Sequence, residues 1–125
     1  MDAIFRVCGA VTRRFDDVPV RGVRVEAFDD DVFRRQCVGH AITDEAGYYE
    51  ILFRQQDFSG RRLPLEQEPD LYVTVLDADG FEMATTRRAL RRNAGVETRI
   101  DVQVSLPTED TLKSARGPFG TLPPG

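Results

Sequence analysis

Apolar and polar residues alternate with a period of two through most of the first 106 residues. In a β-strand this period sends successive side chains to opposite faces. The alternation is clear around Val7 and Val25, whereas residues 36–43 are apolar on both faces. Seven strands are predicted, at residues 5–11, 22–27, 36–43, 48–53, 71–75, 81–85 and 100–106.

Turn-forming residues separate the predicted strands. Asp and Asn side chains bond nearby main-chain groups, and Gly accepts a positive φ. Residues 85–94 predict at most a helical turn or two, and residues 55–69 predict a long loop. The turns are predicted at residues 15–19, 43–47, 77–80 and 93–95. Short strands joined by such turns are typical of an all-β fold, an antiparallel β-sandwich of about seven strands.

One face of each predicted strand carries most of its apolar side chains. Residues of the same parity within a strand lie on the same face, so these side chains are expected to meet between the two sheets. The predicted core consists of Val7, Val11, Val23, Val25, Tyr49, Ile51, Val73, Val75, Ile100, Val102 and Val104.

The composition changes after residue 106. Seven of the 19 residues from 107 to 125 are Pro or Gly, which removes main-chain donors and adds backbone freedom. The sequence therefore predicts a domain at residues 1–106 and an extended C-terminal arm at 107–125. Within the arm, Phe119 and Leu122 are candidates for binding the groove of a partner. The alternative is a flexible end without a role.

The charge and hydropathy of the chain disfavour two classes of partner. With 17 basic and 21 acidic residues the net charge is −4, which disfavours binding to nucleic acid over the whole surface. No apolar run is long enough to span a membrane, and the N-terminus carries no readable signal peptide. A cytoplasmic location is the expectation, with export as part of an assembly as the alternative.

The two cysteines give no indication of a metal site. Cys8 and Cys37 lack a Cys-x-x-Cys spacing and have no neighbouring histidine in the sequence, so zinc is not expected. Without a secretory signal, reduced thiols are the expected state.

Three stretches resemble a known module. They are PVRGVRVEAFD at residues 19–29, VGHAITDEAGYYEI at 38–51 and PDLYVTVLDADG at 69–80. The Thr-Asp-x-x-Gly-x-Tyr hairpin at 43–49 resembles the transthyretin-like (prealbumin-like) domain and its relative, the carboxypeptidase regulatory-like domain. The resemblance covers about residues 3–106 and implies a Greek-key sandwich. The sequence is also similar to modules attached to bacterial toxins and phage-tail-like injection systems.

The enzymes that share this fold need residues that the sequence lacks. The 5-hydroxyisourate hydrolases use two or more histidines and end in Tyr-Arg-Gly-Ser, and intradiol dioxygenases bind iron through two tyrosines and two histidines. Here His40 is the single histidine, and the chain ends in Thr-Leu-Pro-Pro-Gly. The sequence therefore predicts no enzyme, no catalytic residue and no cofactor.

Two further groups of residues are candidates for a nucleophile–base pair and for a calcium site. Cys37 and His40 differ in parity, so an extended strand would point them to opposite faces and prevent nucleophile–base pairing. Acidic residues at 29–31, 44–45, 77 and 79 offer oxygen ligands for Ca²⁺. Capping of turns is the preferred interpretation for Asp44, Asp77 and Asp79. No metal site is predicted.

Four arginines form the second candidate partner-binding group, Arg87, Arg88, Arg91 and Arg92. On a short helix their spacing would place them on one side, where they would contact an acidic protein surface or simply face solvent. No aromatic residue is interleaved for base stacking, which disfavours single-stranded nucleic acid.

The sequence as a whole predicts a non-catalytic protein-binding or adaptor module. The resemblance adds a structural component of a toxin or a contractile injection assembly as the larger context. The alternative is a transthyretin-fold protein that binds or hydrolyses a small molecule in a cleft containing His40. Homo-oligomers through edge strands are left open.

Overall fold

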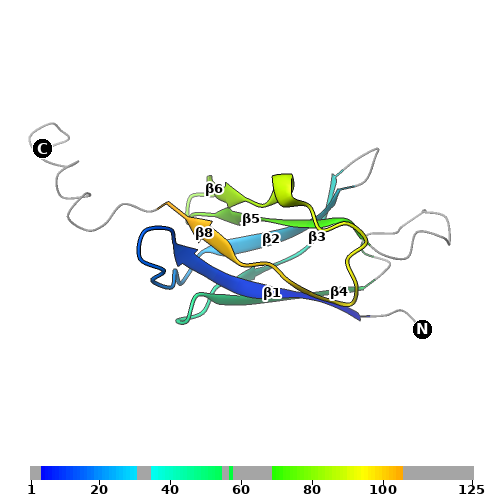
Figure 1. The fold of residues 1–125 in the computed structure, drawn as a ribbon, viewed down its shortest axis with the longest axis horizontal. Helices are drawn as coiled ribbons and strands as arrows, with labels where there is room; N and C mark the ends of the chain where they lie inside the picture. Colours follow the sequence, from blue (N-terminus) through cyan, green and yellow to red (C-terminus); the bar gives the residue numbers. More distant parts are fainter. Residues whose placement is uncertain (1–3, 31–34, 55–56, 58–68, 106–125) are drawn as a thin grey trace, which may run out of the picture.

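Two β-sheets face each other across one apolar layer (Figure 1). The structure is a computed structural model that describes residues 4–30, 35–54, 57 and 69–105. Its strands are β1 (Ile4–Arg13), β2 (Arg24–Asp30), β3 (Arg35–Ile42), β4 (Tyr48–Arg54), β5 (Leu71–Leu76), β6 (Glu82–Thr85), β7 (Glu97–Arg99) and β8 (Val102–Val104). The predicted all-β sandwich is confirmed.

The first sheet is built around β1. β4 pairs with one edge of β1 in antiparallel register, and β7 and β8 pair in succession with the other edge. Both of these C-terminal strands run parallel to β1, with Cys8 opposite Arg99 and Val11 opposite Val102. This differs from the antiparallel arrangement predicted for the last strand.

The second sheet has the order β3-β2-β5-β6, and all of its pairs are antiparallel. A bulge interrupts the pairing of β2 with β3, because Phe28 lies opposite Cys37 while Ala27 lies opposite Gly39. The intervening Val38 is the extra residue, and its side chain is buried. A bulge of this kind reverses the alternation of faces along the strand that carries it.

The core lies between the sheets, where parity predicted it. Each predicted core side chain is buried, and Val7, Val11, Val25, Val73, Val75 and Val104 are fully enclosed. The structure adds Phe5 and Phe53, whose rings stack with centroids 5.3 Å apart. In β4 the core residues alternate with more exposed positions, whereas β5 is buried on both faces.

The hairpins are closed by the turn chemistry that the sequence predicted. The Asp44 carboxylate accepts hydrogen bonds from the main-chain N–H of Ala46 and Tyr48, both at 2.9 Å. Gly47 has φ +74°, and a Cβ there would lie 2.6 Å from the Val11 oxygen, so a side chain is excluded. The Asp77 carboxylate caps the next hairpin in the same way.

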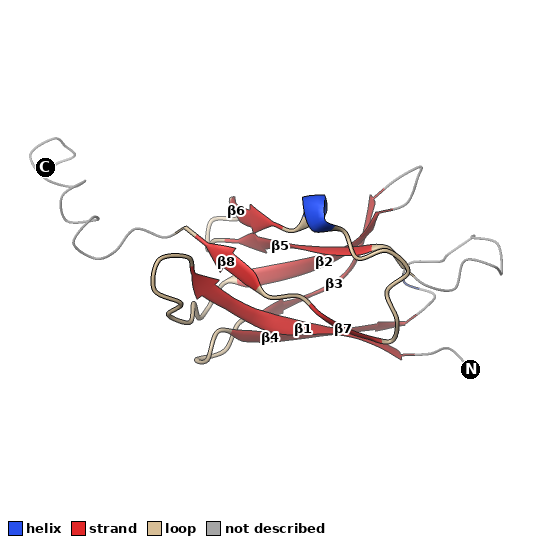
Figure 2. Cartoon of the chain, in the orientation of Figure 1, coloured by secondary structure: helices blue, strands red, loops and turns tan. Residues whose placement is uncertain are grey.

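Two predicted elements differ from the structure. The strand predicted over 100–106 is shorter in the structure, where β8 covers Val102–Val104, and β7 at Glu97–Arg99 is a separate strand that was not predicted. The helical stretch predicted at 85–94 is reduced to one 3₁₀ turn, η1 (Arg87–Ala89), shown in blue in Figure 2. Leu90 adopts an extended ψ of 132° and ends it. Most of the loop 55–69 and the whole of 107–125 lie outside the described residues.

Candidate binding groove between β6 and β8

The edges of the two sheets meet closely on one side of the sandwich. There β3 of one sheet lies against β4 of the other. A Cβ on Gly39 would approach the Ile51 Cγ2 atom to 2.7 Å, so only glycine allows the edges to come this near. We refer to this contact between β3 and β4 as the closed seam.

On the opposite side a groove of about 630 Å³ separates the edges, and we refer to it as the open seam. It runs between β6 and β8, which lie side by side in Figure 1. Its lining comes from both sheets: Thr12, Arg14, Met83, Ala84, Thr85, Thr86, Asp101, Val102 and Gln103.

The lining of the open seam combines apolar and polar atoms. Met83 and Ala84 are half-buried and pack on the core, and Val102 beside them is buried. Threonine hydroxyls and the Gln103 amide lie around them. The Gln103 amide nitrogen also donates to the Asp17 carboxylate at 3.2 Å. Such a surface matches a polypeptide, which presents alternating apolar side chains and polar main-chain groups.

Main-chain groups of both bordering strands point away from their own sheets. The Thr86 N–H donates to the Val73 C=O at 2.9 Å, so Thr85, one residue earlier, directs its N–H and C=O away from β5. The Arg14 N–H donates to the Val104 C=O at 2.9 Å, so Gln103 directs its own groups away from β1. Among the described residues, β6 pairs only with β5, and β8 pairs only with β1.

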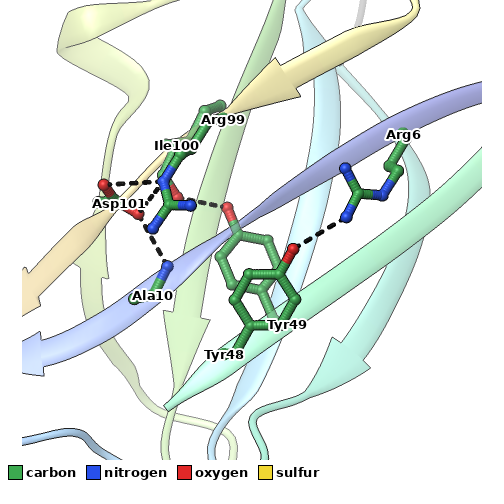
Figure 3. A network of polar contacts seen from close by, with 7 residues as sticks. All are labelled: Arg6, Ala10, Tyr48, Tyr49, Arg99, Ile100 and Asp101. Carbon is green, nitrogen blue, oxygen red and sulfur yellow. Dashed lines mark hydrogen bonds and ion pairs between the residues drawn. The ribbon is translucent and has the colours of Figure 1, made fainter. Parts of the chain in front are cut away.

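A set of close contacts fixes the β8 wall of the open seam (Figure 3). The Tyr49 hydroxyl donates to the Ile100 C=O at 2.7 Å, and the Ile100 N–H donates to the Cys8 C=O at 2.8 Å. The tyrosine reaches this carbonyl because Gly9 carries no side chain. A Cβ on Gly9 would lie 1.9 Å from the Ile100 oxygen. Burial raises the pKa of Tyr49, so the phenol stays protonated as a donor.

Asp101 bridges the break between β7 and β8. Its carboxylate accepts from the Ala10 N–H at 2.9 Å and from the Arg99 guanidinium at 3.1 Å (Figure 3). Burial alone would raise the pKa of this carboxyl group, but the hydrogen bonds from Arg99 and Ala10 outweigh burial and lower it. The charge of Asp101 is therefore already compensated within the protein.

Arg14, in contrast, is exposed and makes no ion pair with any residue that the structure describes. Its neighbour Arg13 bonds the Asp16 carboxylate at 2.5 Å. Since Asp101 is paired with Arg99, the lining of the open seam carries one uncompensated charge, which is the Arg14 cation.

A second polar network covers the outer face of the first sheet. Arg6 donates to Glu50 at 2.5 Å, to Glu97 at 3.0 Å and to the Tyr48 hydroxyl at 2.9 Å (Figure 3 shows the tyrosine contact). Bonds to the two carboxylates raise the pKa of Arg6, and a hydrogen bond with Cys8 raises that of Tyr48. Arg6 thereby links β4 and β7 to β1, which is a structural role.

The four arginines predicted to share a helix face do not do so. All four are exposed, but η1 ends at Ala89 and Arg91 pairs through its main chain with Leu71. Arg87 lies 5.8 Å from the Tyr72 ring and 3.8 Å from the Asp30 carboxylate. Extended backbone after Ala89 is the reason that the helical spacing does not apply. The other candidates, Phe119 and Leu122, lie outside the described residues.

The parity argument about Cys37 and His40 is wrong. The bulge at Val38 pairs Cys37 with Phe28 and His40 with Glu26, two positions on the same face of β2. Both side chains are exposed, yet no hydrogen bond joins these two described residues. Neither residue belongs to the lining of the open seam.

The described ranges lack two further classes of site. No group of three or more His, Cys, Asp or Glu side chains there is placed to hold a metal ion. No helix in these ranges has the length and apolar character that crossing a membrane requires.

The sequence matches no family model and no curated protein, whereas its fold is similar to that of solved structures. A 9R-lipoxygenase from Cyanothece PCC8801 aligns with a TM-score of 0.56 and 18% identity, over 82% of this chain and 16% of its own. A DUF3823 family protein from Parabacteroides merdae aligns with a TM-score of 0.50 and 14% identity, over 84% and 47%. This chain therefore spans less than half the length of either protein.

A third structure is the dioxygenase domain of a dioxygenase–carbohydrate-binding protein fusion from Streptomyces sp. SirexAA-E. It aligns with a TM-score of 0.49 and 17% identity, over 85% of this chain and 82% of its own. These similarities concern the fold. The β-sandwich itself is shown by the two sheets described above.

Proposed function

We propose that this chain is a non-catalytic protein-binding module whose open seam receives an extended segment of a partner. The observation that carries the proposal is the pair of outward-facing main chains at Thr85 and Gln103, which border the same groove. An extended peptide satisfies such edges by adding a strand, and alternate side chains then enter the groove.

The dimensions of the open seam agree with this use. β6 has four residues and β8 has three, so each edge offers only a few hydrogen bonds. A short strand added there would gain affinity from these few main-chain hydrogen bonds together with contact to the half-buried Met83 and Ala84. The small number of contacts predicts a modest affinity, as in transient recognition.

We further propose that the module is transthyretin-like, or carboxypeptidase regulatory-like, and works as part of a larger assembly. The hairpin at residues 43–49 and the sandwich fold support the family. The lipoxygenase supports modular use, because a fold of this kind makes up only 16% of that chain. The proposed context is a toxin or a phage-tail-like injection system, on the sequence similarity described above.

The competing proposal of a small-molecule cleft gains no comparable support. It requires His40 at a polar cleft, and His40 lies on β3 at the opposite edge of its sheet from β6. The lining of the open seam contains no histidine.

The test is site-specific crosslinking from the open seam in the cells of origin. A photoreactive amino acid at Gln103 is expected to crosslink a partner protein. The same group at Leu52, which is 57% exposed on the outer face of β4, is expected not to do so. Thr85→Pro removes an outward N–H that its own sheet does not use, and it also removes the hydroxyl that bonds Thr74 and Val73. Thr85→Val is the matched control, since it loses the hydroxyl but keeps the N–H, so we expect Thr85→Pro to lose the crosslink and Thr85→Val to keep it. Equal crosslinking from both positions, unaffected by Thr85→Pro, would show that the open seam is not the binding site.

A further inference from the structure

We infer that the open seam selects an acidic segment, and that Arg14 binds a carboxylate side chain of the partner. This inference rests on the proposed function and adds the chemistry of the ligand to it. Its basis is the charge balance of the lining, in which Arg14 is the one ionised side chain without a described counterion.

Other arginines close to the open seam are paired within the protein. Arg13 contacts the Asp16 carboxylate at 2.5 Å, and Arg99 contacts Asp101 at 3.1 Å. Arg14 follows Arg13 directly, but it belongs to the lining of the open seam and makes no ion pair with a described residue. A guanidinium offers five donors in a planar fork, and a carboxylate fits two of them at once.

The main chain of Arg14 fixes where the partner's carboxylate must lie. The Arg14 N–H bonds the Val104 C=O at 2.9 Å, so this residue adjoins the last position of β8. Gln103, whose main-chain groups point away from β1, is one position earlier. A segment that pairs with Gln103 would therefore place its acidic residue within one or two positions of that pairing, at the Val104 end.

Asp101, the acidic residue of the lining, does not compete with Arg14 for the same ligand. Asp101 is held by the Arg99 guanidinium and by the Ala10 N–H. A basic partner residue would have to displace Arg99, whereas an acidic one at Arg14 displaces only water. Electrostatic complementarity of this kind determines which partner is accepted and how fast it associates.

The test is a selection from a displayed library of random heptapeptides, with the full chain as the target. Peptides that bind the wild type are expected to be enriched in Asp and Glu. For the best of them, Arg14→Glu should weaken binding about tenfold, as loss of a charge-assisted hydrogen bond does. Selection against Arg14→Glu should instead enrich Lys and Arg. Arg54→Glu makes the same charge change on β4, away from the groove, and should alter affinity less than about twofold.

The outcomes separate the two proposals. Peptides that lose binding on Thr85→Pro but carry no acidic residue, or that tolerate Arg14→Glu, would overturn the inference and leave the proposed function standing. Peptides that bind Thr85→Pro and the wild type equally would overturn both. If no peptide is enriched, both are wrong.

Discussion

The closed and open seams are built from edge strands of different length. β3 and β4, which meet at the closed seam, have eight and seven residues, whereas β6 and β8 have four and three. The long edges come so close at Gly39 that a Cβ there would contact Ile51, whose side chain is buried. Short edges leave Met83 and Ala84 half-buried and a groove beside them. The same core therefore supports one side where the edge strands meet and one where a groove separates them.

The largest expected effect contrasts truncation at the two seams. Ile51→Ala leaves a cavity under the closed seam, because the side chain is 2% exposed, and should lower the free energy of unfolding by about 3–4 kcal/mol. Met83→Ala removes a half-buried side chain at the open seam and should cost about 1 kcal/mol. Urea denaturation of both variants measures the difference. Equal losses would contradict the distinction between the seams.

The wall of the open seam is predicted to depend on a glycine. Gly9→Ala would place a Cβ 1.9 Å from the Ile100 oxygen, which forces β1 and the β7–β8 break apart. We expect a loss of about 2–3 kcal/mol, in the range for overpacking. Gly95→Ala is the control, since a Cβ there meets no atom within 4 Å. A Gly9→Ala variant that melts with the control would show that the strands can separate freely.

Tyr49 is expected to contribute less than Gly9 to the same wall. Tyr49→Phe removes the hydroxyl that donates to Ile100 and leaves a buried carbonyl without that donor. The expected loss of stability is about 1–2 kcal/mol. Amide hydrogen exchange should also accelerate in β8 more than in β3. Unchanged protection of β8 would show that the hydrogen bond does not hold this wall.

The smallest expected effect is the pH dependence of Asp101. Its pKa is lowered from 3.8 in the folded state, so its contribution is present above that value and is lost as the pH falls through the folded pKa. At pH 7 Asp101→Asn should cost less than about 1 kcal/mol, because the exposed carboxylate is screened by solvent. The difference between wild type and variant should shrink as the pH falls below 3.8 and vanish once the carboxyl group is protonated in the folded state. A difference that persists there would assign the effect to packing.

Much of the fold was predictable because alternation of apolar and polar residues with a period of two indicates which side chains are buried. Along β4, Tyr49 and Ile51 alternate with less buried neighbours and lie in the core, and Asp44 and Asp77 form the turns expected of them. The bulge at Val38 was not predictable. Residues 36–43 are apolar on both faces, so an extra residue there does not change the alternation of apolar and polar positions. The faces of Cys37 and His40 were misassigned for this reason.

The open seam was also not predictable from the alternation of residues within single strands. The alternation of Val102, Gln103 and Val104 predicts that Gln103 faces outward. It does not predict that β8 runs parallel to β1, or that β6 is the edge across from it. The pairing of β8 with β1 brings together residues 91 positions apart in sequence, such as Ala10 and Asp101. The helical spacing expected for the four arginines does not apply for a related reason, because η1 ends at Ala89 and Arg91 forms a main-chain bridge with Leu71.

The parallel pairing of β1 with β8 has a consequence for the order of folding. The Ala10 N–H bonds a carboxylate 91 residues later, so the first sheet joins the earliest described strand to the latest one. Contacts of such long range make folding slow, because a large loop must close before they form. Until residues 97–104 have been synthesised, a growing chain presents one whole edge of β1 unpaired. Such an edge invites aggregation, so this protein would benefit from a chaperone more than its small size suggests.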